Sequence, residues 1–247
     1  MHRLLLLGGT REALELAQAA AGTPELHTIT SLAGHTRAPA EITGEVRVGG
    51  FGGAEGLARF LEAEAVDFVV DATHPFAAVM ARNAAQACRE TGVPGLKLLR
   101  PAWKSESGDR WIEVESTEQA AEALPGLAGR VFLTVGRRDL QAFSRCPRIW
   151  FLVRLIDPPG GPLPIARHEM VLGRGPFAEA DEIALMRRHR IEALVAKNSG
   201  GDLTYAKIAA ARRLGLPVVM RRRPAPPPGA TVETVEQALA WIATRPG

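Results

Sequence analysis

Short apolar strands alternate with helical segments along this chain of 247 residues, and this alternation narrows the folds that it can adopt. Strands rich in leucine and valine that are separated by helices indicate a parallel sheet covered on both faces. The sequence therefore predicts the α/β class. In the first hundred residues, strands are predicted at 4–7, 26–31, 45–48, 68–71 and 96–99, and helices at 12–21, 57–63 and 77–90.

A second series of the same kind follows a change of pattern near residues 100–110, where proline, tryptophan, serine and glycine gather. A chain of this length can hold two small α/β domains. We therefore predict two doubly wound domains, one over residues 1–100 and the other over residues 101–247. In the second series, strands are predicted at 131–135, 149–155, 194–196 and 217–220, and helices at 117–123, 177–189, 204–214 and 232–244.

Composition excludes several classes of protein. The chain is 46% hydrophobic, enough for a core, and its two cysteines are too few for a disulfide scaffold or a zinc site, so we expect no metal. The apolar run after Arg3 ends at Leu7, which is too short for a signal peptide or a membrane span, so we expect a cytoplasmic protein. With a net charge of +3 and no interleaving of basic and aromatic residues, a small polyanionic ligand is favoured over nucleic acid.

Residues 8–13, Gly-Gly-Thr-Arg-Glu-Ala, follow the first strand and form a variant of the dinucleotide-binding fingerprint. Gly8 permits a tight turn, and the small Ala13 lets the helix lie close to the strand. Thr10 replaces the middle glycine, and its hydroxyl can cap the helix and donate to a phosphate oxygen. The helix N-terminus offers N–H groups and positive potential to a pyrophosphate. A tight turn capped by threonine, without a ligand, is the alternative interpretation.

The residues after the second strand bear on the choice between NAD and NADP. An NAD site usually has an acid about twenty residues after the glycines, and residues 30–37 contain none. Ser31, Thr36 and Arg37 instead offer hydroxyls and a guanidinium that suit a ribose 2′-phosphate. A solvated surface loop explains these three residues equally well. The missing acid itself argues against NAD, so we predict NADPH as the ligand.

Two further candidate segments follow the third and fourth strands. Four of residues 49–53 are glycines, which would let the backbone approach a ligand, and Phe51 could pack against a ring. Residues 71–76, Asp-Ala-Thr-His-Pro-Phe, gather a carboxylate, a hydroxyl and an imidazole where a nicotinamide would lie. His74 could donate a proton or hold a substrate carboxylate. Ordinary turn glycines, and a capping Thr73 beside a solvent-facing histidine, are the alternatives.

Two loops of the second series combine backbone freedom with cationic or amide donors. Residues 134–139, Thr-Val-Gly-Arg-Arg-Asp, follow one strand, and residues 197–204, Lys-Asn-Ser-Gly-Gly-Asp-Leu-Thr, follow another. Such loops suit a carboxylate or a phosphate, and Thr204 can cap the next helix. The arginine triplet at 221–223 is more typical of a solvated face. The only tyrosine, Tyr205, is not followed by a lysine four residues later, which excludes the mechanism of short-chain dehydrogenases.

Taken in order, these motifs resemble the precorrin-6A reductase family of cobalamin biosynthesis over nearly the whole chain. The resemblance implies two Rossmann-like domains with the ligands in the cleft between them. It also implies NADPH-dependent reduction of the C18–C19 double bond of precorrin-6A, or of its cobalt form, to precorrin-6B. The acetate and propionate groups of this tetrapyrrole would explain the many arginines. The motifs are Leu-Gly-Gly-Thr-Arg-Glu-Ala, Ser-Leu-Ala-Gly, Gly-Gly-Phe-Gly-Gly, Asp-Ala-Thr-His-Pro-Phe-Ala, Val-Gly-Arg-Arg and Lys-Asn-Ser-Gly-Gly.

On this basis each predicted site residue has one role. The catalytic candidates are His74 and Asp71, with water as the alternative proton donor. A reductase of another small imine or enoyl substrate, and a non-catalytic NADPH-binding sensor, are the alternative functions. The cofactor-binding candidates are Gly8, Gly9, Thr10, Arg11, Ser31, Ala33, Gly34, Arg37, Gly49, Gly50, Phe51, Gly52, Thr73 and Pro75. The substrate-binding candidates are Gly136, Arg137, Lys197, Asn198, Ser199, Gly200, Gly201 and Thr204.

Overall fold

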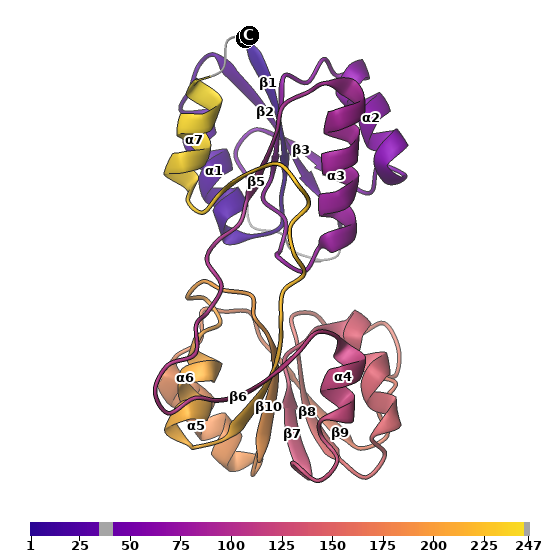
Figure 1. Cartoon of the computed structure of the whole chain (residues 1–247), viewed down its shortest axis with the longest axis vertical. Helices are drawn as coiled ribbons and strands as arrows, with labels where there is room; N and C mark the ends of the chain where they lie inside the picture. The colour runs from indigo at the N-terminus through magenta and orange to yellow at the C-terminus, as the bar shows by residue number, and fades with distance from the viewer. Residues whose placement is uncertain (35–41, 245–247) are drawn as a thin grey trace. The chain divides into compact units, whose positions relative to one another are not determined.

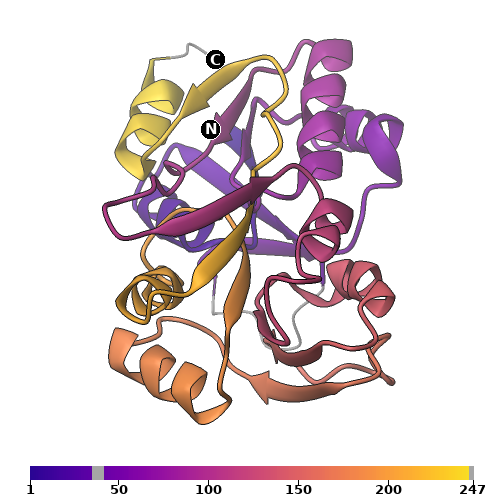
Figure 2. The same ribbon diagram turned by 60° about the horizontal axis from the view of Figure 1, so that its bottom comes forward.

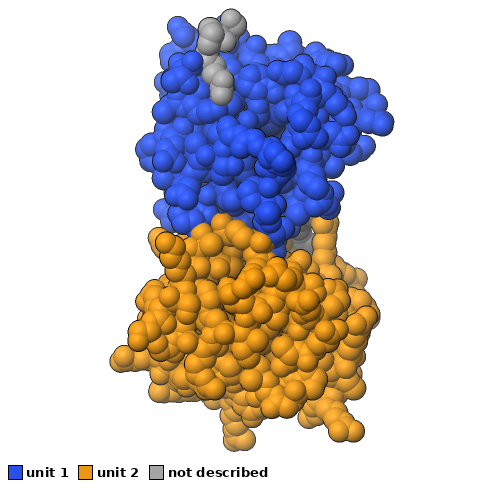
Figure 3. Space-filling view, viewed as in Figure 1, with its two compact units in different colours: residues 1–101, 224–247 blue, residues 102–223 orange. Residues whose placement is uncertain are grey.

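The computed structural model describes residues 1–34 and 42–244, which form two compact units (Figure 3). Unit 1 comprises Met1–Pro101 together with the C-terminal segment from Pro224, and unit 2 comprises Ala102–Arg223. None of the described helices has the length and apolar character that a membrane span requires.

Unit 1 is built on a six-stranded parallel sheet in the order β3-β2-β1-β4-β5-β12. With β12 in sixth place, this is the 3-2-1-4-5-6 order typical of dinucleotide-binding sheets. Its elements are β1 (His2–Leu7), α1 (Arg11–Ala21), β2 (Leu26–Leu32), β3 (Glu45–Val48), α2 (Gly53–Ala63), β4 (Phe68–Asp71), α3 (Ala78–Thr91), β5 (Gly95–Leu98), β12 (Ala230–Val232) and α7 (Val235–Ala243). In Figure 1, α1 and α7 lie on one side of these strands and α2 and α3 on the other.

Helices cover both faces of this sheet, which explains the unbroken apolar run of β1. Successive side chains of a strand point to opposite faces. Leu4 and Leu6 accordingly pack with α1 and α7, whereas Leu5 and Leu7 pack with α2 and α3. All four leucines are buried, so β1 lies at the centre of the core and fixes the position of the turn that follows it.

Unit 2 repeats this plan with the parallel strand order β9-β8-β7-β10-β11-β6. The short helices α4 and η1 pack on one face of its sheet, and α5 and α6 pack on the other. Its elements are β6 (Arg110–Val114), α4 (Thr117–Glu122), β7 (Arg130–Leu133), the 3₁₀ helix η1 (Arg137–Arg145), β8 (Trp150–Leu155), β9 (His168–Leu172), α5 (Glu179–Arg188), β10 (Ala193–Lys197), α6 (Ala206–Arg213) and β11 (Pro217–Arg221).

Unit 1 takes its sixth strand from the C-terminal segment of the chain, whereas the sixth strand of unit 2 is the first that the chain forms there. After β5 the chain enters unit 2 as β6, which pairs with β11, and after β11 it returns to unit 1 as β12, which pairs with β5 (Figure 2). Ala238 and Ile242 of α7 then pack in the same cluster as α1. The expectation that all of residues 101–247 form the second domain is therefore corrected, because residues 224–247 complete the sheet and core of unit 1.

The predicted elements are present, with shifted ends, and three strands were not predicted. The helix expected from residue 232 begins at Val235, because Val232 belongs to β12. The unpredicted strands are β6, β9 and β12, and each leaves most of its residues exposed or half-buried. Edge strands of this kind lack the buried apolar run that marks the central strands.

Candidate functional site

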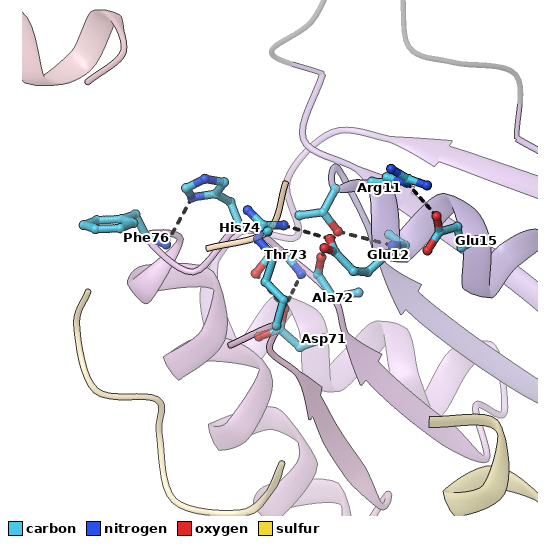
Figure 4. Close-up of polar contacts among 12 residues, drawn as sticks. Arg11, Glu12, Glu15, Asp71, Ala72, Thr73, His74 and Phe76 are labelled. Atoms are coloured by element: carbon cyan, nitrogen blue, oxygen red, sulfur yellow. Dashed lines mark hydrogen bonds and ion pairs between the residues drawn. The ribbon is translucent and has the colours of Figure 1, made fainter. Parts of the chain in front are cut away.

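The strand order of unit 1 reverses between β1 and β4, and the loops after these two strands meet at that point (Figure 4). In open α/β sheets, ligands bind outside the carboxyl ends of the strands at such a switch point. The N–H of Ala72 donates to the carbonyl of Leu7 at 3.0 Å, and Thr10 Oγ1 donates to the carbonyl of Ala72 at 2.7 Å. The structure thus brings together the glycine turn at 8–13 and the polar segment at 71–76.

The turn after β1 needs both of its glycines. The N–H of Gly8 donates to the carbonyl of Ser31 at 2.9 Å, and a Cβ on Gly8 would lie 3.2 Å from Thr30 Cγ2 and 3.3 Å from Leu32 Cδ2. Gly9 has φ of +107°, a conformation that side chains rarely adopt. The first glycine leaves room for the side chains of Thr30 and Leu32 on β2, and the second turns the chain toward α1.

Thr10 caps α1, as predicted, because its Oγ1 accepts from the N–H of Ala13 at 3.2 Å. The same hydroxyl gives its hydrogen to Ala72, whereas the sequence favoured donation to a phosphate oxygen. Arg11, which follows, directs Nε to Glu15 at 2.6 Å along the exposed side of the helix. Thr10 therefore joins the two loops of the switch point.

Asp71 is buried at the end of β4, and three donors surround its carboxylate. Oδ1 accepts from the N–H of Thr73 at 2.9 Å and from Thr73 Oγ1 at 2.6 Å, and Oδ2 lies 3.0 Å from Nζ of Lys97. Lys97 also donates to the Thr73 carbonyl at 3.2 Å. Burial lowers the pKa of Lys97, and the charge of Asp71 opposes that shift. These contacts tie Asp71 to Thr73 and Lys97, and its catalytic role stays a prediction.

His74 lies on this loop, and its orientation is set from within the chain. Nδ1 accepts from the N–H of Phe76 at 3.2 Å, and the two rings are tilted at 5.8 Å between centroids (Figure 4). A neutral imidazole whose Nδ1 accepts carries its hydrogen on Nε2. Pro75 is buried in the turn before α3, which begins at Ala78. A neutral, half-buried His74 with this contact would carry its hydrogen on Nε2.

At the ends of β2 and β3, Ser31 lies beside a residue that the sequence reasoning missed. Arg47 is the cross-strand partner of Ser31, and Nη1 lies 3.3 Å from its Oγ. The guanidinium also donates to the carbonyls of Gly49 at 2.7 Å and Gly50 at 2.8 Å. Its carbon lies 3.8 Å from the centroid of the Phe51 ring. The glycine loop after β3 is thus fastened by an arginine rather than left open.

Some of the other cofactor-binding candidates at this edge of the sheet lie within the described residues, and others do not. Ala33 and Gly34 directly follow β2, and Gly34 has φ of +72°. Gly52 has φ of +83° where α2 begins. The loop passes so close to Gly56 that a Cβ there would lie 1.7 Å from the Phe51 carbonyl oxygen. Thr36 and Arg37 lie outside the described residues.

In unit 2, the two loops predicted to bind substrate follow β7 and β10, the strands between which its order reverses. Lys197 Nζ lies 2.5 Å from Oδ2 of Asp139, which follows Gly136 and Arg137 on the neighbouring loop. Arg221 Nη1 lies 3.2 Å from Oδ1 of the same Asp139. The structure therefore brings both loops together around one carboxylate and adds Arg221, from the triplet that the sequence analysis treated as a solvated face.

Asn198 is buried within this loop, and both ends of its amide are used by Trp103. Oδ1 accepts from the backbone N–H of Trp103 at 2.8 Å, and Nδ2 donates to its carbonyl at 2.9 Å. The Trp103 indole N–H donates to the carbonyl of Gly201 at 2.8 Å. Gly200 and Gly201 both have positive φ, and the N–H of Ser199 donates to the Lys197 carbonyl at 2.7 Å. Asn198 accordingly holds the loop in shape, although the sequence indicated contact with substrate.

The C-terminal end of the loop at residues 197–204 contacts a buried lysine. Lys207 Nζ donates to the carbonyl of Thr204 at 2.8 Å, and burial lowers the pKa of Lys207 to about 7 against the opposing charge of Glu182. The prediction that Thr204 caps the following helix is wrong. The N-cap of α6 is Tyr205, with no side-chain cap, because the chain enters that helix through a turn that already has helical dihedral angles.

A sequence signal could have revealed one of the residues that were missed. Lys97 stands in an otherwise apolar strand, and a lysine is seldom buried unless it is paired, so an acid such as Asp71 on the neighbouring strand could have been sought. Arg47 becomes informative only once β2 and β3 are known to pair with Ser31 opposite it. Nothing local connects Trp103 with Asn198, because 95 positions separate them.

Comparisons with known proteins agree with this architecture. The family model of precorrin-6x reductase CbiJ/CobK matches residues 3–243. A precorrin-6A reductase of Rhodococcus erythropolis is 51% identical over 99% of this chain and 98% of its own length. A cobalt-precorrin-6A reductase of Priestia megaterium is 28% identical over 96% of each chain. The solved structure of CobK precorrin-6A reductase is 45% identical and has a TM-score of 0.93, with 98% of this chain and 96% of that chain covered.

The match to the family model therefore extends over both units of the structure, with their sheets and sequence motifs. A family of reductases requires a source of electrons, and a nicotinamide cofactor as that source agrees with the switch-point turn of unit 1. On the family model, the relatives and the structural match together, this chain belongs to the precorrin-6x reductases of the CbiJ/CobK family.

Proposed function

We propose that this chain reduces precorrin-6A to precorrin-6B at the C18–C19 double bond, with NADPH as the reductant. The switch point of unit 1 carries the proposal, because the turn after β1 and the polar loop after β4 meet there through Thr10 and Ala72. The relative named for the metal-free substrate is 51% identical, against 28% for the one named for the cobalt form. This difference supports the metal-free precorrin as the substrate.

The residues of unit 1 fit a dinucleotide. Gly8 and Gly9 keep side chains away from the N-terminus of α1, where a pyrophosphate would meet backbone N–H groups. The residues that the structure describes after β2, up to Gly34, include no acid to bind a ribose 2′-hydroxyl as NAD sites do. Ser31 and Arg47 occupy that edge instead. A donor set of hydroxyl and guanidinium suits a phosphate better than a diol.

When bound, the cofactor supplies a hydride, and saturation of the double bond then also requires one proton. Neutral His74 carries its hydrogen on Nε2 while Nδ1 accepts from Phe76. To supply the proton, His74 would be protonated on both nitrogens and would give up the Nε2 proton, so its Nδ1 would carry a hydrogen and the contact with the Phe76 N–H would open. The contacts among Asp71, Thr73 and Lys97 hold the backbone of the loop that carries His74. Asp71 would thereby act on the reaction through the loop and not as an acid.

The loops of unit 2 would bind the substrate's carboxylates. Lys197 and Arg221 both contact Asp139, so two cationic side chains lie together at the ends of β10 and β11. Asn198 and Trp103 fix the backbone of the loop beside it before any substrate arrives. A fixed loop loses little conformational freedom on binding.

The proposal is tested by incubating the purified chain with precorrin-6A and either NADPH or NADH, while the tetrapyrrole spectrum and nucleotide absorbance are followed together. We expect equimolar loss of NADPH and substrate, with much slower loss of NADH. Binding of NADPH without its consumption would instead indicate a sensor, and consumption only with small imines would indicate another reductase.

A further inference from the structure

Arg47 occupies a defined place at the carboxyl edge of the unit 1 sheet. Leu7 of β1, Ser31 of β2 and Arg47 of β3 are aligned in one row across three paired strands. The row begins at the residue before the Gly8 turn and ends at the guanidinium. A dinucleotide that placed its pyrophosphate on that turn would extend its adenosine ribose toward the ends of β2 and β3.

The charge of Arg47 has no carboxylate partner within the described residues. Its contacts are with neutral groups: the carbonyls of Gly49 and Gly50, the hydroxyl of Ser31 and the ring of Phe51. The acid of the same strand, Glu45, is 2.9 Å from His27 instead. A half-buried guanidinium of this kind therefore presents net positive charge at the sheet edge.

The same contacts hold the guanidinium in one orientation. Both hydrogens of Nη1 and one of Nη2 are engaged by oxygen atoms of this chain, while the ring of Phe51 supports the guanidinium at 3.8 Å. This leaves the hydrogen on Nε and the second hydrogen of Nη2, for which the described part of the chain offers no acceptor. Two guanidinium donors fixed in place match the oxygens of a phosphate.

We propose that Arg47, with Ser31 beside it, binds the 2′-phosphate of NADPH and sets the preference of this chain for NADPH over NADH. This inference rests on the proposed function, since it assumes that a nicotinamide dinucleotide binds at the Gly8 turn. It keeps Ser31 and adds Arg47 of β3, whereas the sequence pointed to Ser31 with Thr36 and Arg37. A purely structural Arg47 that only fastens the loop after β3 is the competing explanation.

The test measures binding, independently of turnover. Calorimetric titrations of the whole chain with NADPH, NADH, 2′,5′-ADP and 5′-AMP compare ligands that differ in the 2′-phosphate. For Arg47→Gln, we expect the Kd for NADPH and 2′,5′-ADP to rise about 10- to 100-fold, as for loss of hydrogen bonds to a charged group. The Kd for NADH and 5′-AMP should stay within about twofold. Arg89→Gln, in the last turn of α3, removes the same charge elsewhere and should change none of the four.

Two outcomes would overturn the inference. An equal rise of all four Kd values for Arg47→Gln would mean that the residue only shapes the loop, and unchanged values would mean that it does not contact the ligand. Arg47→Lys keeps the charge and should give an intermediate Kd for 2′,5′-ADP, which provides the test if the glutamine variant fails to fold. If the wild-type chain prefers NADPH and Arg47→Gln retains that preference, only the inference fails. If the wild-type chain binds neither dinucleotide, the proposed function fails with it.

Discussion

Lys97 and Asp71 form a buried ion pair at the switch point of unit 1, with Nζ 3.0 Å from Oδ2 and side chains only 8% and 7% exposed. The pair joins the end of β4 to β5, and Thr73 completes it by bonding to both partners. A buried ion pair therefore holds the start of the polar loop after β4. His74 directly follows Thr73 on this loop.

Removal of the lysine should therefore cost stability and also disturb the loop. Lys97→Met leaves the Asp71 carboxylate buried without its cation, and we expect the free energy of unfolding to fall by about 3–5 kcal/mol. Urea denaturation measures this loss. The exposed Lys104→Met is the control and should change the free energy by less than about 0.5 kcal/mol. Equal small losses for the two variants would show that the pair does not stabilise the fold.

The threonine of the glycine turn can be compared with a second capping threonine of the same unit. Thr10→Val removes the cap of α1 and the bond to Ala72, and Thr234→Val removes the capping box of α7. Each should lower the free energy of unfolding by about 1 kcal/mol. Only Thr10→Val should weaken NADPH binding, because only Thr10 joins the two loops of the switch point. Equal effects of the two variants on the Kd for NADPH would contradict this account.

The proton-donor role of His74 predicts a defect in turnover and not in cofactor binding. Replacement by glutamine retains a polar side chain but cannot supply the proton, so kcat should fall about 100-fold or more. The Kd for NADPH, measured by fluorescence titration, should change little. A kcat that is unchanged across the pH range would assign the proton to water.

Lys207 makes the stability of unit 2 depend on pH in a definite direction. In the folded chain its pKa is about 7, against 10.5 for an ordinary lysine, because it is buried. Between these values the unfolded chain binds more protons at this position, so the free energy of unfolding should rise with pH across that window. Lys207→Met removes this pH dependence. Because Lys97 is present in both proteins, the difference between their free energies of unfolding reports the titration of Lys207 alone. Parallel stability curves from pH about 7 to about 10 would show that Lys207 does not titrate in this way.

The sequence was informative wherever function and fold depend on contiguous residues. The turn at Gly8 and the polar segment at Asp71 could be located because both directly follow apolar strands. Parallel strands end at one edge of a sheet, so their proximity followed from the α/β class. The segments that carry the candidate site residues could thus be located from the sequence alone.

The partners of these segments could not be predicted, because strand register and long-range packing supply them. Asp71 resembles a free acid until Lys97 is placed on the neighbouring strand, and Asn198 resembles a substrate ligand until Trp103 is seen to occupy its amide. The pairing of β6 with β11 and of β12 with β5 had no local signal for a related reason. Whether a short, exposed segment becomes an edge strand depends on the sheet that it joins more than on its own residues.

The central claim is that NADPH donates hydride to precorrin-6A on this chain. The most direct measurement is the mass of the tetrapyrrole formed with NADPH carrying deuterium at C4 of the nicotinamide. The account predicts a product that contains a single deuterium from one of the two C4-labelled diastereomers and none from the other. A product that forms without deuterium from either diastereomer would contradict it.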